Sequence, residues 1–379
     1  MKLAVFLKAP EVWGAERSLL TLLASGPAKD HLIEIFVSPK SPLCEELDRL
    51  GIKWTAFNFV SHRSIADGGL KNASPLSVVL DLFQIFMGGL KARRRVKQFD
   101  AVLTFGLWET PEIALAGRLS RTPVIFDFHV TFSGRTGQLA LKQIMRLVTG
   151  VIAPAKATYT QAGIDSHSLS CRQVVVPRPV TTPAVRENTQ ISPQARRLRV
   201  GMFGQVDDRK GILEVIETLS PLAGEVELLI VGVRPTAFRT DYERTVLANI
   251  EAVGHGWTAL PRSTDVSALM SRCDVVLNMS RHEAFGRTVV EAACVGTVPL
   301  VFSGGGPEEI VNDMGAGIVV HSWEDLRARM AELSRSAAAG ADLKLTNDQV
   351  QAIRHNYSPG VLAEKYFQKV QVLASPGRR

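Results

Sequence analysis

The 379-residue sequence has few cysteines and no long uninterrupted apolar run. Its 4 cysteines are widely separated and show no C-x-x-C spacing, so we expect neither a disulfide framework nor a zinc site, and a reduced cytoplasm fits. The longest apolar segment, residues 75–90, is interrupted by Asp81 and Gln84 and is shorter than the ~20 residues that cross a bilayer. The apolar run after Met1 is too short for a signal peptide. We therefore expect a cytoplasmic protein without a transmembrane helix.

Several motifs of cofactor, metal and nucleic-acid binding are also missing from the sequence. No G-x-G-x-x-G follows the first expected strand of either half, which argues against an NAD-dependent enzyme. No Asp-x-Asp pair is present to hold a divalent ion, so we expect no metal and no other cofactor. Basic and aromatic residues are not interleaved as in nucleic-acid-binding proteins, so nucleic acid is not an expected partner.

Positive charge is abundant and unevenly distributed. The net charge is +7, and residues 1–185 hold 22 Lys and Arg against 14 Asp and Glu, whereas the remainder holds 22 against 23. A basic cluster follows the apolar, helix-like segment of residues 77–90. One interpretation is contact with anionic lipid headgroups at the inner face of a membrane. The other is a core helix with a solvated basic end, which the helix dipole favours. The cluster comprises Lys91, Arg93, Arg94, Arg95 and Lys97.

Short apolar runs alternate with segments of helical periodicity along the whole chain, which predicts an α/β fold with parallel sheets crossed by helices. Residues 1–180 form one such series and residues 198–357 a second. The polar, proline-containing stretch 181–197 reads as a linker. Residues 358–374 are predicted to be a helix. The expected architecture is two doubly wound, Rossmann-like domains facing a cleft, because ligands bind beyond the carboxyl ends of parallel strands.

The most informative motif lies between Ser280 and Glu309. An apolar run, residues 274–279, predicts a buried strand, after which Gly286 would open a helix. The first turn of a helix has unpaired N–H groups and a partial positive charge, which suit a diphosphate. Glu291 would lie inside the helix, where it could accept a hydrogen bond from a ribose hydroxyl. Glu283 would lie outside the helix and face the group attached to the phosphate.

Glu283, Phe285, Gly286 and Glu291 match an E-x-F-G-x-x-x-x-E frame, and in this the sequence resembles the retaining glycosyltransferases of family 4. The resemblance implies the glycosyltransferase-B architecture, a nucleotide diphosphate-sugar donor and retention of anomeric configuration. It also implies that the last helix crosses back to the first domain. Donor contacts are expected from Phe285, Gly286, Arg287 and Glu291, with Glu283 orienting the sugar.

The segment 198–211 resembles a second donor-side element of that family. Gly204, Lys210 and Gly211 match it, and Lys210 is expected to neutralise the leaving diphosphate. Gln205 stands where the family has an arginine. Arg209 is the candidate substitute, although its fork need not reach the same oxygens.

In the first half, Gly14 opens a helix and resembles the family's loop near the donor phosphate, but Trp13 replaces the loop's first glycine. His129 follows an apolar strand where the family often has a histidine near the reacting sugar, and it is a catalytic candidate. The alternative is a structural histidine. Asp127 would share its side of the strand and orient the imidazole or cap a turn. Trp257 would stack on the nucleotide base or pack in the core.

The predicted function is therefore a retaining glycosyltransferase that moves a sugar from a nucleotide-sugar to a hydroxyl acceptor, either a glycan or a lipid-linked intermediate of cell-surface polysaccharide synthesis. Two alternatives stay open. A nucleotide-sugar epimerase of the same fold would alter the donor without an acceptor. A non-catalytic sugar-nucleotide-binding subunit is suggested by the changes at Trp13 and Gln205.

Overall fold

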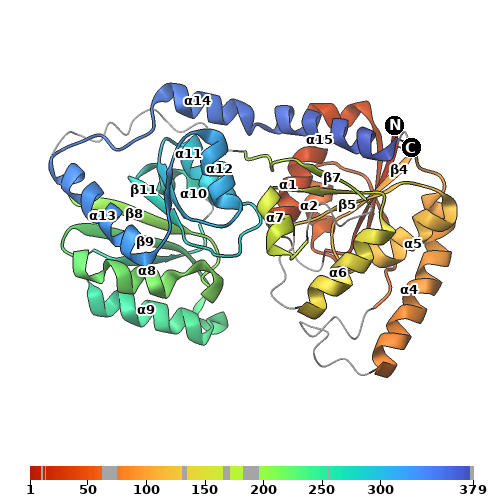
Figure 1. The fold of residues 1–379 in the computed structure, drawn as a ribbon, viewed down its shortest axis with the longest axis horizontal. Coiled ribbons are helices and arrows are strands. Elements are labelled where there is room, and N and C mark those ends of the chain that lie inside the picture. The colour runs from red at the N-terminus through yellow and green to blue at the C-terminus, as the bar shows by residue number, and fades with distance from the viewer. Residues whose placement is uncertain are drawn as a thin grey trace. The chain divides into compact units, whose positions relative to one another are not determined.

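The structure, a computed structural model, describes residues 1–9, 12, 14–61, 75–129, 135–164, 171–181, 196–254, 256–263 and 265–375. The chain divides into two compact units. Unit 1 comprises Met1–Pro179 and Ser358–Arg379, and unit 2 comprises Val180–Tyr357. Each unit is a parallel sheet with helices packed on it, which confirms the expected pair of doubly wound α/β domains (Figure 1).

Unit 1 contains a 7-stranded parallel sheet in the order β3-β2-β1-β4-β5-β6-β7. Side chains of β1 alternate between the two faces, because successive residues of a strand point to opposite sides. Leu3, Val5 and Leu7 join one core cluster with residues of α1, α2 and α15, whereas Ala4 and Phe6 join another with residues of α4 to α7. The strands are β1 (Lys2–Leu7), β2 (Leu32–Val37), β3 (Trp54–Ala56), β4 (Ala101–Thr104), β5 (Val124–Asp127), β6 (Gly150–Ala153) and β7 (Arg172–Val175).

Helices therefore cover both faces of this sheet, as the doubly wound prediction requires. They are α1 (Gly14–Leu23), η1 (Gly26–Asp30), α2 (Leu43–Arg49), α4 (Pro75–Val96), α5 (Thr110–Ser120), α6 (Arg135–Leu147), α7 (Lys156–Gln161) and α15 (Pro359–Ala374).

Unit 2 contains a 6-stranded parallel sheet in the order β10-β9-β8-β11-β12-β13. The chain proceeds outward from β8 through β9 to β10, then returns beside β8 with β11 and continues to β13. The strand order therefore reverses between β8 and β11. The strands are β8 (Leu198–Phe203), β9 (Val226–Val233), β10 (Thr258–Pro261), β11 (Val275–Asn278), β12 (Val298–Phe302) and β13 (Ile318–Val320).

Two core clusters lie against this second sheet, one including residues of α8, α9 and α13, and the other including residues of α10 and α11. The helices of unit 2 are η4 (Asp208–Lys210), α8 (Ile212–Leu219), η5 (Ser220–Leu222), η6 (Thr236–Phe238), α9 (Asp241–Val253), α10 (Val266–Ser271), α11 (Arg287–Cys294), α12 (Gly306–Met314), α13 (Trp323–Ala338) and α14 (Asn347–Asn356).

The last helix, α15, belongs to unit 1 although it follows unit 2 in the chain. Ser358 caps it by accepting a hydrogen bond from the Val361 N–H at 3.4 Å. Tyr366 is fully buried, and its hydroxyl donates to Asp127 Oδ2 at 2.7 Å. The same carboxylate forms a buried ion pair with Arg178, whose Nη1 lies 3.0 Å from Oδ2. Asp127 therefore anchors two segments to the end of β5, a role that neither sequence-based suggestion for it included.

Three short strands were not predicted from the sequence patterns: β3, β7 and β10. All three are edge strands of their sheets. Most of the proposed linker, residues 182–195, lies outside the described residues, as does Trp13. Among the described helices, none combines the length and apolar character needed to cross a membrane.

Candidate functional site

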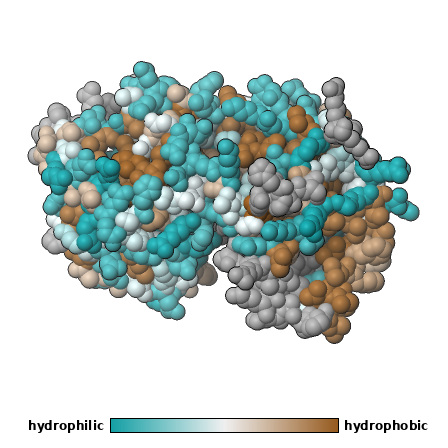
Figure 2. Space-filling view, viewed as in Figure 1, coloured by the Kyte–Doolittle hydropathy of each residue, from teal (hydrophilic) through white to brown (hydrophobic). Residues whose placement is uncertain are grey.

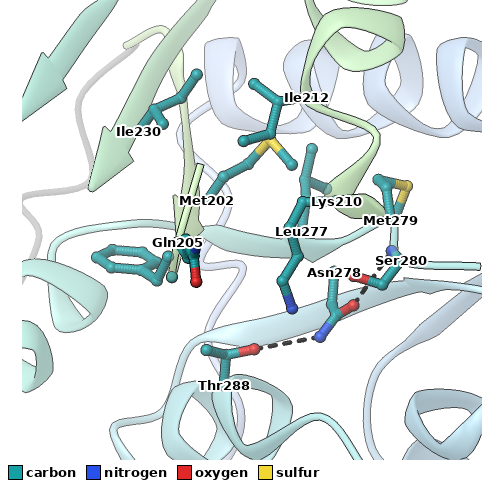
Figure 3. A pocket seen from close by; sticks show the side chains of 12 residues that line it. Met202, Gln205, Lys210, Ile212, Ile230, Leu277, Asn278, Met279, Ser280 and Thr288 are labelled. Atoms are coloured by element: carbon teal, nitrogen blue, oxygen red, sulfur yellow. Dashed lines mark hydrogen bonds between the residues drawn. The ribbon is translucent and has the colours of Figure 1, made fainter. Parts of the chain in front are cut away.

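Unit 2 has a hollow at the carboxyl ends of β8 and β11, where the strand order of its sheet reverses. Its cavity volume is about 20 Å³, and it opens to solvent. In open α/β sheets ligands bind at such a reversal, because the two neighbouring loops diverge to opposite faces and leave a crevice. The lining residues are Met202, Phe203, Gly204, Gln205, Lys210, Ile212, Ile230, Leu277, Asn278, Met279, Ser280 and Thr288 (Figure 3).

Lys210 supplies the positive charge of this hollow. It ends the short helix η4 and is followed by Gly211, whose φ of +65° favours glycine. A Cβ on Gly211 would lie 3.2 Å from the Met279 carbonyl oxygen, so the glycine also lets this turn approach the end of β11. The Lys210 ammonium forms an ion pair with the Glu283 carboxylate. Their side chains are 28% and 26% exposed, so the pair is accessible to a ligand.

Gly286 opens α11 as the sequence predicts. Its φ is +87°, and a Cβ there would lie 2.9 Å from Pro307 Cγ. The loop before it rests on the start of α12, where the Gly306 N–H donates to the Glu283 carbonyl oxygen at 3.1 Å. A Cβ on Gly306 would be 2.3 Å from the Ala284 oxygen. The glycine-rich segment 303–307 thus has a structural task, which is to support the loop that carries Glu283.

A polar bridge from β11 to α11 was missed by the sequence analysis. Asn278 Nδ2 donates to Thr288 Oγ1 at 3.2 Å, and Asn278 Oδ1 accepts from the Ser280 N–H at 3.3 Å (Figure 3). The Ser280 hydroxyl is buried and has no hydrogen-bond partner within the described part of the chain. The sequence feature that could have revealed this bridge is the asparagine at the end of an otherwise apolar strand, because a buried side-chain amide is normally hydrogen-bonded.

The other predicted donor-side residues do not all face the hollow. Arg287 and Glu291 are paired on α11, with Nη2 and Oε1 3.2 Å apart, and both are partly exposed. Phe285 is buried and packs against Tyr357, with ring centroids 6.5 Å apart, so its side chain is not accessible to a ligand.

Arg209 is bound to Asp207 at 2.7 Å, and this hydrogen bond raises the pKa of Arg209. The charge of Glu283 also raises the pKa of Arg209, so Arg209 lies near the pair of Lys210 and Glu283, and its contact with the donor stays a prediction.

Two glycines shape the Gly204 side of the hollow. Gly204 has a φ of +127°, and its N–H donates to the Val231 oxygen at 3.0 Å. A Cβ on the neighbouring Gly232 would overlap the Gly204 oxygen at 1.8 Å. Trp257 takes no part in this hollow. It is buried, and its indole N–H donates to the Val226 oxygen at 3.0 Å, as core packing requires.

The candidate residues of unit 1 lie at the carboxyl ends of its own strands. Gly14 is the first residue of α1. His129 follows β5 and packs on Phe105, with ring centroids 5.1 Å apart. Its Nδ1 atom is buried and has no hydrogen-bond partner among the described residues. Burial lowers the pKa of His129, against the opposing charge of Asp127. Burial therefore favours the neutral form of the imidazole.

Unit 1 also contains two buried carboxylates that the sequence analysis did not identify. Glu109 accepts hydrogen bonds from the N–H groups of Phe105 and Gly106, and Glu112 accepts from the Val60 N–H at 3.3 Å. Burial raises the pKa of both carboxyls to about 7. Lys8 donates to the Val60 oxygen at 2.7 Å, and burial lowers the pKa of Lys8.

Comparison with known proteins identifies the domain that contains the hollow. Residues 186–353 match the family model described as "Glycosyl transferases group 1". This segment is a glycosyltransferase domain. A glycogen synthase from Chlorobium phaeobacteroides is 25% identical over 201 residues, which are 51% of this chain and 40% of that protein. The chain spans less than half the length of the glycogen synthases that it matches.

Solved structures extend the likeness to the whole fold. HepE from Anabaena in complex with UDP has a TM-score of 0.73 at 18% identity, covering 98% of this chain and 100% of that one. A glycosyltransferase from Rickettsia africae has a TM-score of 0.74 at 19% identity, covering 99% of each chain. The two parallel-sheet domains thus form the glycosyltransferase-B fold.

Within the glycosyltransferase domain lie the donor-side candidates Gly204, Lys210, Glu283, Gly286 and Glu291. Gly14 and His129 lie outside the matched segment, in unit 1.

Proposed function

We propose that this protein is a glycosyltransferase that moves a sugar from a nucleoside diphosphate to a hydroxyl acceptor, with retention of anomeric configuration as in the family 4 enzymes it resembles. The observation that carries the proposal is the partly exposed pair of Lys210 and Glu283 beside the first turn of α11, at the strand reversal of the glycosyltransferase domain. A cation and a helix N-terminus at one point suit a diphosphate.

Donor binding would exchange partners at this ion pair. A diphosphate oxygen would take the place of the Glu283 carboxylate at Lys210, and Glu283 would become free to accept hydrogen bonds from the sugar hydroxyls. Glu291 is held by Arg287 and lies one helical turn into α11, where it would accept a hydrogen bond from ribose. HepE, which shares the fold, has been crystallised with UDP and with UDP-glucose, so uridine diphosphate-sugars are the first donors to test.

The proposed reaction breaks the bond between the anomeric carbon and the diphosphate oxygen and forms a bond from that carbon to the acceptor oxygen. The transition state has oxocarbenium character. Lys210 and the N–H groups at Gly286 and Arg287 would stabilise the charge that develops on the leaving diphosphate. The acceptor hydroxyl would attack the anomeric carbon from the face that the diphosphate leaves. A diphosphate oxygen would take the proton of that hydroxyl. The lysine and the amides supply the positive charge, so we propose no metal cofactor.

The proposed acceptor is a glycan or a lipid-linked intermediate, bound over unit 1. The proposed role of His129 is a hydrogen bond to an acceptor hydroxyl, which requires acceptor binding to expose Nδ1, an atom that is buried and has no partner in the described residues. An acceptor carried on a lipid would require the enzyme to work at a membrane surface. The basic cluster of residues 91–97 gives unit 1 the charge to approach anionic lipids.

Thermal-shift and turnover measurements with a panel of nucleotide-sugars would test the donor site. We expect one nucleotide to raise the melting temperature, and Lys210→Ala and Glu291→Ala to abolish that rise. Matched controls are Lys365→Ala and Glu332→Ala, which remove exposed residues of α15 and α13. Equal shifts in the wild type and in both site variants would refute the site.

A non-catalytic nucleotide-binding subunit is the second candidate. It is favoured by Gln205, which lines the hollow where the resemblance expects an arginine. Such a subunit would show the nucleotide-dependent thermal shift but neither transfer to any acceptor nor slow hydrolysis of the donor. Turnover that disappears in Lys210→Ala would exclude it.

A further inference from the structure

Helix α4 has an unusual distribution of side chains for a helix on the outside of a sheet. A surface helix normally buries its large apolar residues and exposes its polar ones. In α4 the buried side includes Asp81, Gly88, Gly89, Ala92 and Val96, which are an acid, three small residues and one valine. The helix therefore packs inward through these residues together with the half-buried Val78 and Ile85.

The small residues let α4 approach α5 closely. A Cβ on Gly88 would lie 2.4 Å from Glu112 Oε2, and a Cβ on Gly89 would lie 2.9 Å from Leu115 Cδ2. Most of the larger side chains of α4 are exposed, among them Leu82, Phe83 and Phe86. Both interpretations of this segment stay open, because Ala92 and Val96 join the core cluster while most of the larger side chains are exposed.

The outer side of α4 is strongly apolar. Its exposed large side chains form a continuous hydrophobic surface, visible as the brown area at the lower right of Figure 2, over the position of α4 in Figure 1. Monomeric soluble proteins rarely expose so many neighbouring apolar side chains, and such patches mark interaction surfaces. The residues and their exposures are Leu76 69%, Val79 60%, Leu80 42%, Leu82 60%, Phe83 61%, Phe86 49%, Met87 38% and Leu90 40%.

The carboxyl end of the same helix is cationic. Lys91, Arg93, Arg94 and Lys97 are exposed, and the spacing of three and four residues places Arg94 and Lys97 on the stripe that includes Phe83, Met87 and Leu90. Arg95 instead reaches back over the Phe36 ring, with its guanidinium 5.8 Å from the centroid. The only acidic residue of α4 is the buried Asp81.

We propose that α4 docks unit 1 on an anionic lipid bilayer, with the helix lying in the plane of the headgroups. The apolar side chains would enter the boundary between headgroups and acyl chains, and the cations would contact anionic headgroups. Its role in delivering a lipid-linked acceptor rests on the proposed function, whereas the docking itself does not.

The charge of the helix favours lipid over a second copy of this chain. A second copy of α4 would bring no exposed acidic residue of α4 to pair with these cations, so its charge does not complement them. An anionic bilayer supplies both an apolar phase for the phenylalanines and negative charge for the arginines and lysines.

Co-sedimentation with vesicles of phosphatidylcholine alone, and of phosphatidylcholine with phosphatidylglycerol, tests the proposal. The full chain should partition to the anionic vesicles, and raising the salt from 50 to 500 mM should reduce this about tenfold. Phe83→Ser with Phe86→Ser should lower the partition coefficient about tenfold or more, because two apolar side chains no longer leave water. Arg94→Gln with Lys97→Gln should lower it about tenfold on anionic vesicles only.

Matched controls distinguish docking through α4 from nonspecific binding of other exposed side chains to the vesicles. Phe238→Ser removes an exposed phenylalanine of unit 2, 73% exposed, and should leave binding unchanged. Lys365→Gln with Lys369→Gln removes two exposed cations of α15 in unit 1 and should have no more than a small effect. Equal losses in these controls, or no loss in the α4 variants, would overturn the proposal.

Insertion has its own signal. In Phe83→Trp the added fluorescence should shift to the blue on anionic vesicles and be quenched by brominated acyl chains. Phe238→Trp should show neither change. If light scattering instead finds a dimer that Phe83→Ser with Phe86→Ser converts to monomer, and vesicles do not bind, then α4 is a self-association surface and the lipid proposal is wrong.

The two proposals fail separately. Vesicle binding is measured without nucleotide, so Glu291→Ala should bind vesicles like the wild type. The double serine variant of α4 should keep the nucleotide-dependent thermal shift. If the wild type binds vesicles but shows no nucleotide-dependent thermal shift, the donor-site proposal is wrong. If it shows the thermal shift but does not bind vesicles, the docking proposal is wrong.

Discussion

Carboxylates lie at the carboxyl ends of strands in both units, but the two units hold them in different ways. In unit 1, Asp127, Glu109 and Glu112 are buried and bound by neighbouring groups of the fold. In unit 2, Glu283 and Glu291 are about a quarter exposed, and each is paired with one flexible cation. Buried carboxylates of the first kind stabilise a fold, whereas exposed pairs of the second kind can exchange partners with a ligand.

Removal of the buried charge in unit 1 should have the largest effect. Asp127→Asn would leave the Arg178 guanidinium buried without its counter-charge, so we expect a loss of about 3–5 kcal/mol in the free energy of unfolding. Urea denaturation measures it. The control Asp241→Asn removes the exposed partner of Arg244 and should cost less than about 1 kcal/mol. Similar small losses in both variants would mean that the two kinds of ion pair do not differ.

The exposed pair of unit 2 should behave in the opposite way. Lys210→Ala should reduce kcat about 100-fold or more, because charge on the leaving diphosphate loses its lysine. The melting temperature without ligand should change little, since the pair is accessible to solvent. Steady-state kinetics and thermal denaturation of one preparation give both values. Arg244→Ala, which removes an exposed cation paired with Asp241 outside the hollow, is the control and should keep most of the activity.

A pH titration should separate the buried acids of unit 1 from those of unit 2. Burial raises the pKa of Glu109 from an ordinary value of 4.5 to about 7, against the opposing effects of nearby N–H groups and Lys8. The folded state therefore holds this proton more tightly than the unfolded state does. The resulting stability is complete below about pH 4.5 and is lost as the pH rises through about 7.

Glu109→Gln should reduce the change in the free energy of unfolding between about pH 4.5 and pH 7 by at most on the order of 3 kcal/mol. Denaturation at several pH values measures this change. Glu112, which faces the same lysine and has its pKa raised to about 7, should keep part of the slope. A slope identical to that of the wild type would show that Glu109 is ionised in the fold.

The smallest expected effect comes from restoring a cation to unit 2. Gln205 lines the hollow next to Gly204, so Gln205→Arg should tighten diphosphate binding about fivefold by adding one charge-assisted hydrogen bond. Calorimetry with the preferred nucleotide would detect the change. The control Gln205→Lys tests whether charge alone is sufficient, and weaker binding in both variants would mean that the position does not face the phosphates.

Most central strands could be predicted because they are continuous apolar runs bounded by turns, as in residues 198–203 and 275–278. The edge strands β3 and β10 could not, because they are short and only partly buried, so their composition resembles that of loops. The sequence left open whether residues 77–97 form a membrane-facing helix or a core helix with a solvated basic end. A run of leucines and phenylalanines indicates a helix, but its packing on α5 depends on glycines whose importance appears only when the two helices meet.

By itself the sequence determined what depends on neighbours along the chain. The strand, the left-handed glycine and the helix of residues 275–294 follow from local composition, as does the capping box of Thr240 and Glu243. Only the tertiary structure decided which distant side chains meet. Lys210 and Glu283 are 73 positions apart, and Tyr366 is 239 positions from Asp127. Such pairs depend on the order of strands in a sheet, which no local pattern encodes, because it results from the packing of the whole unit.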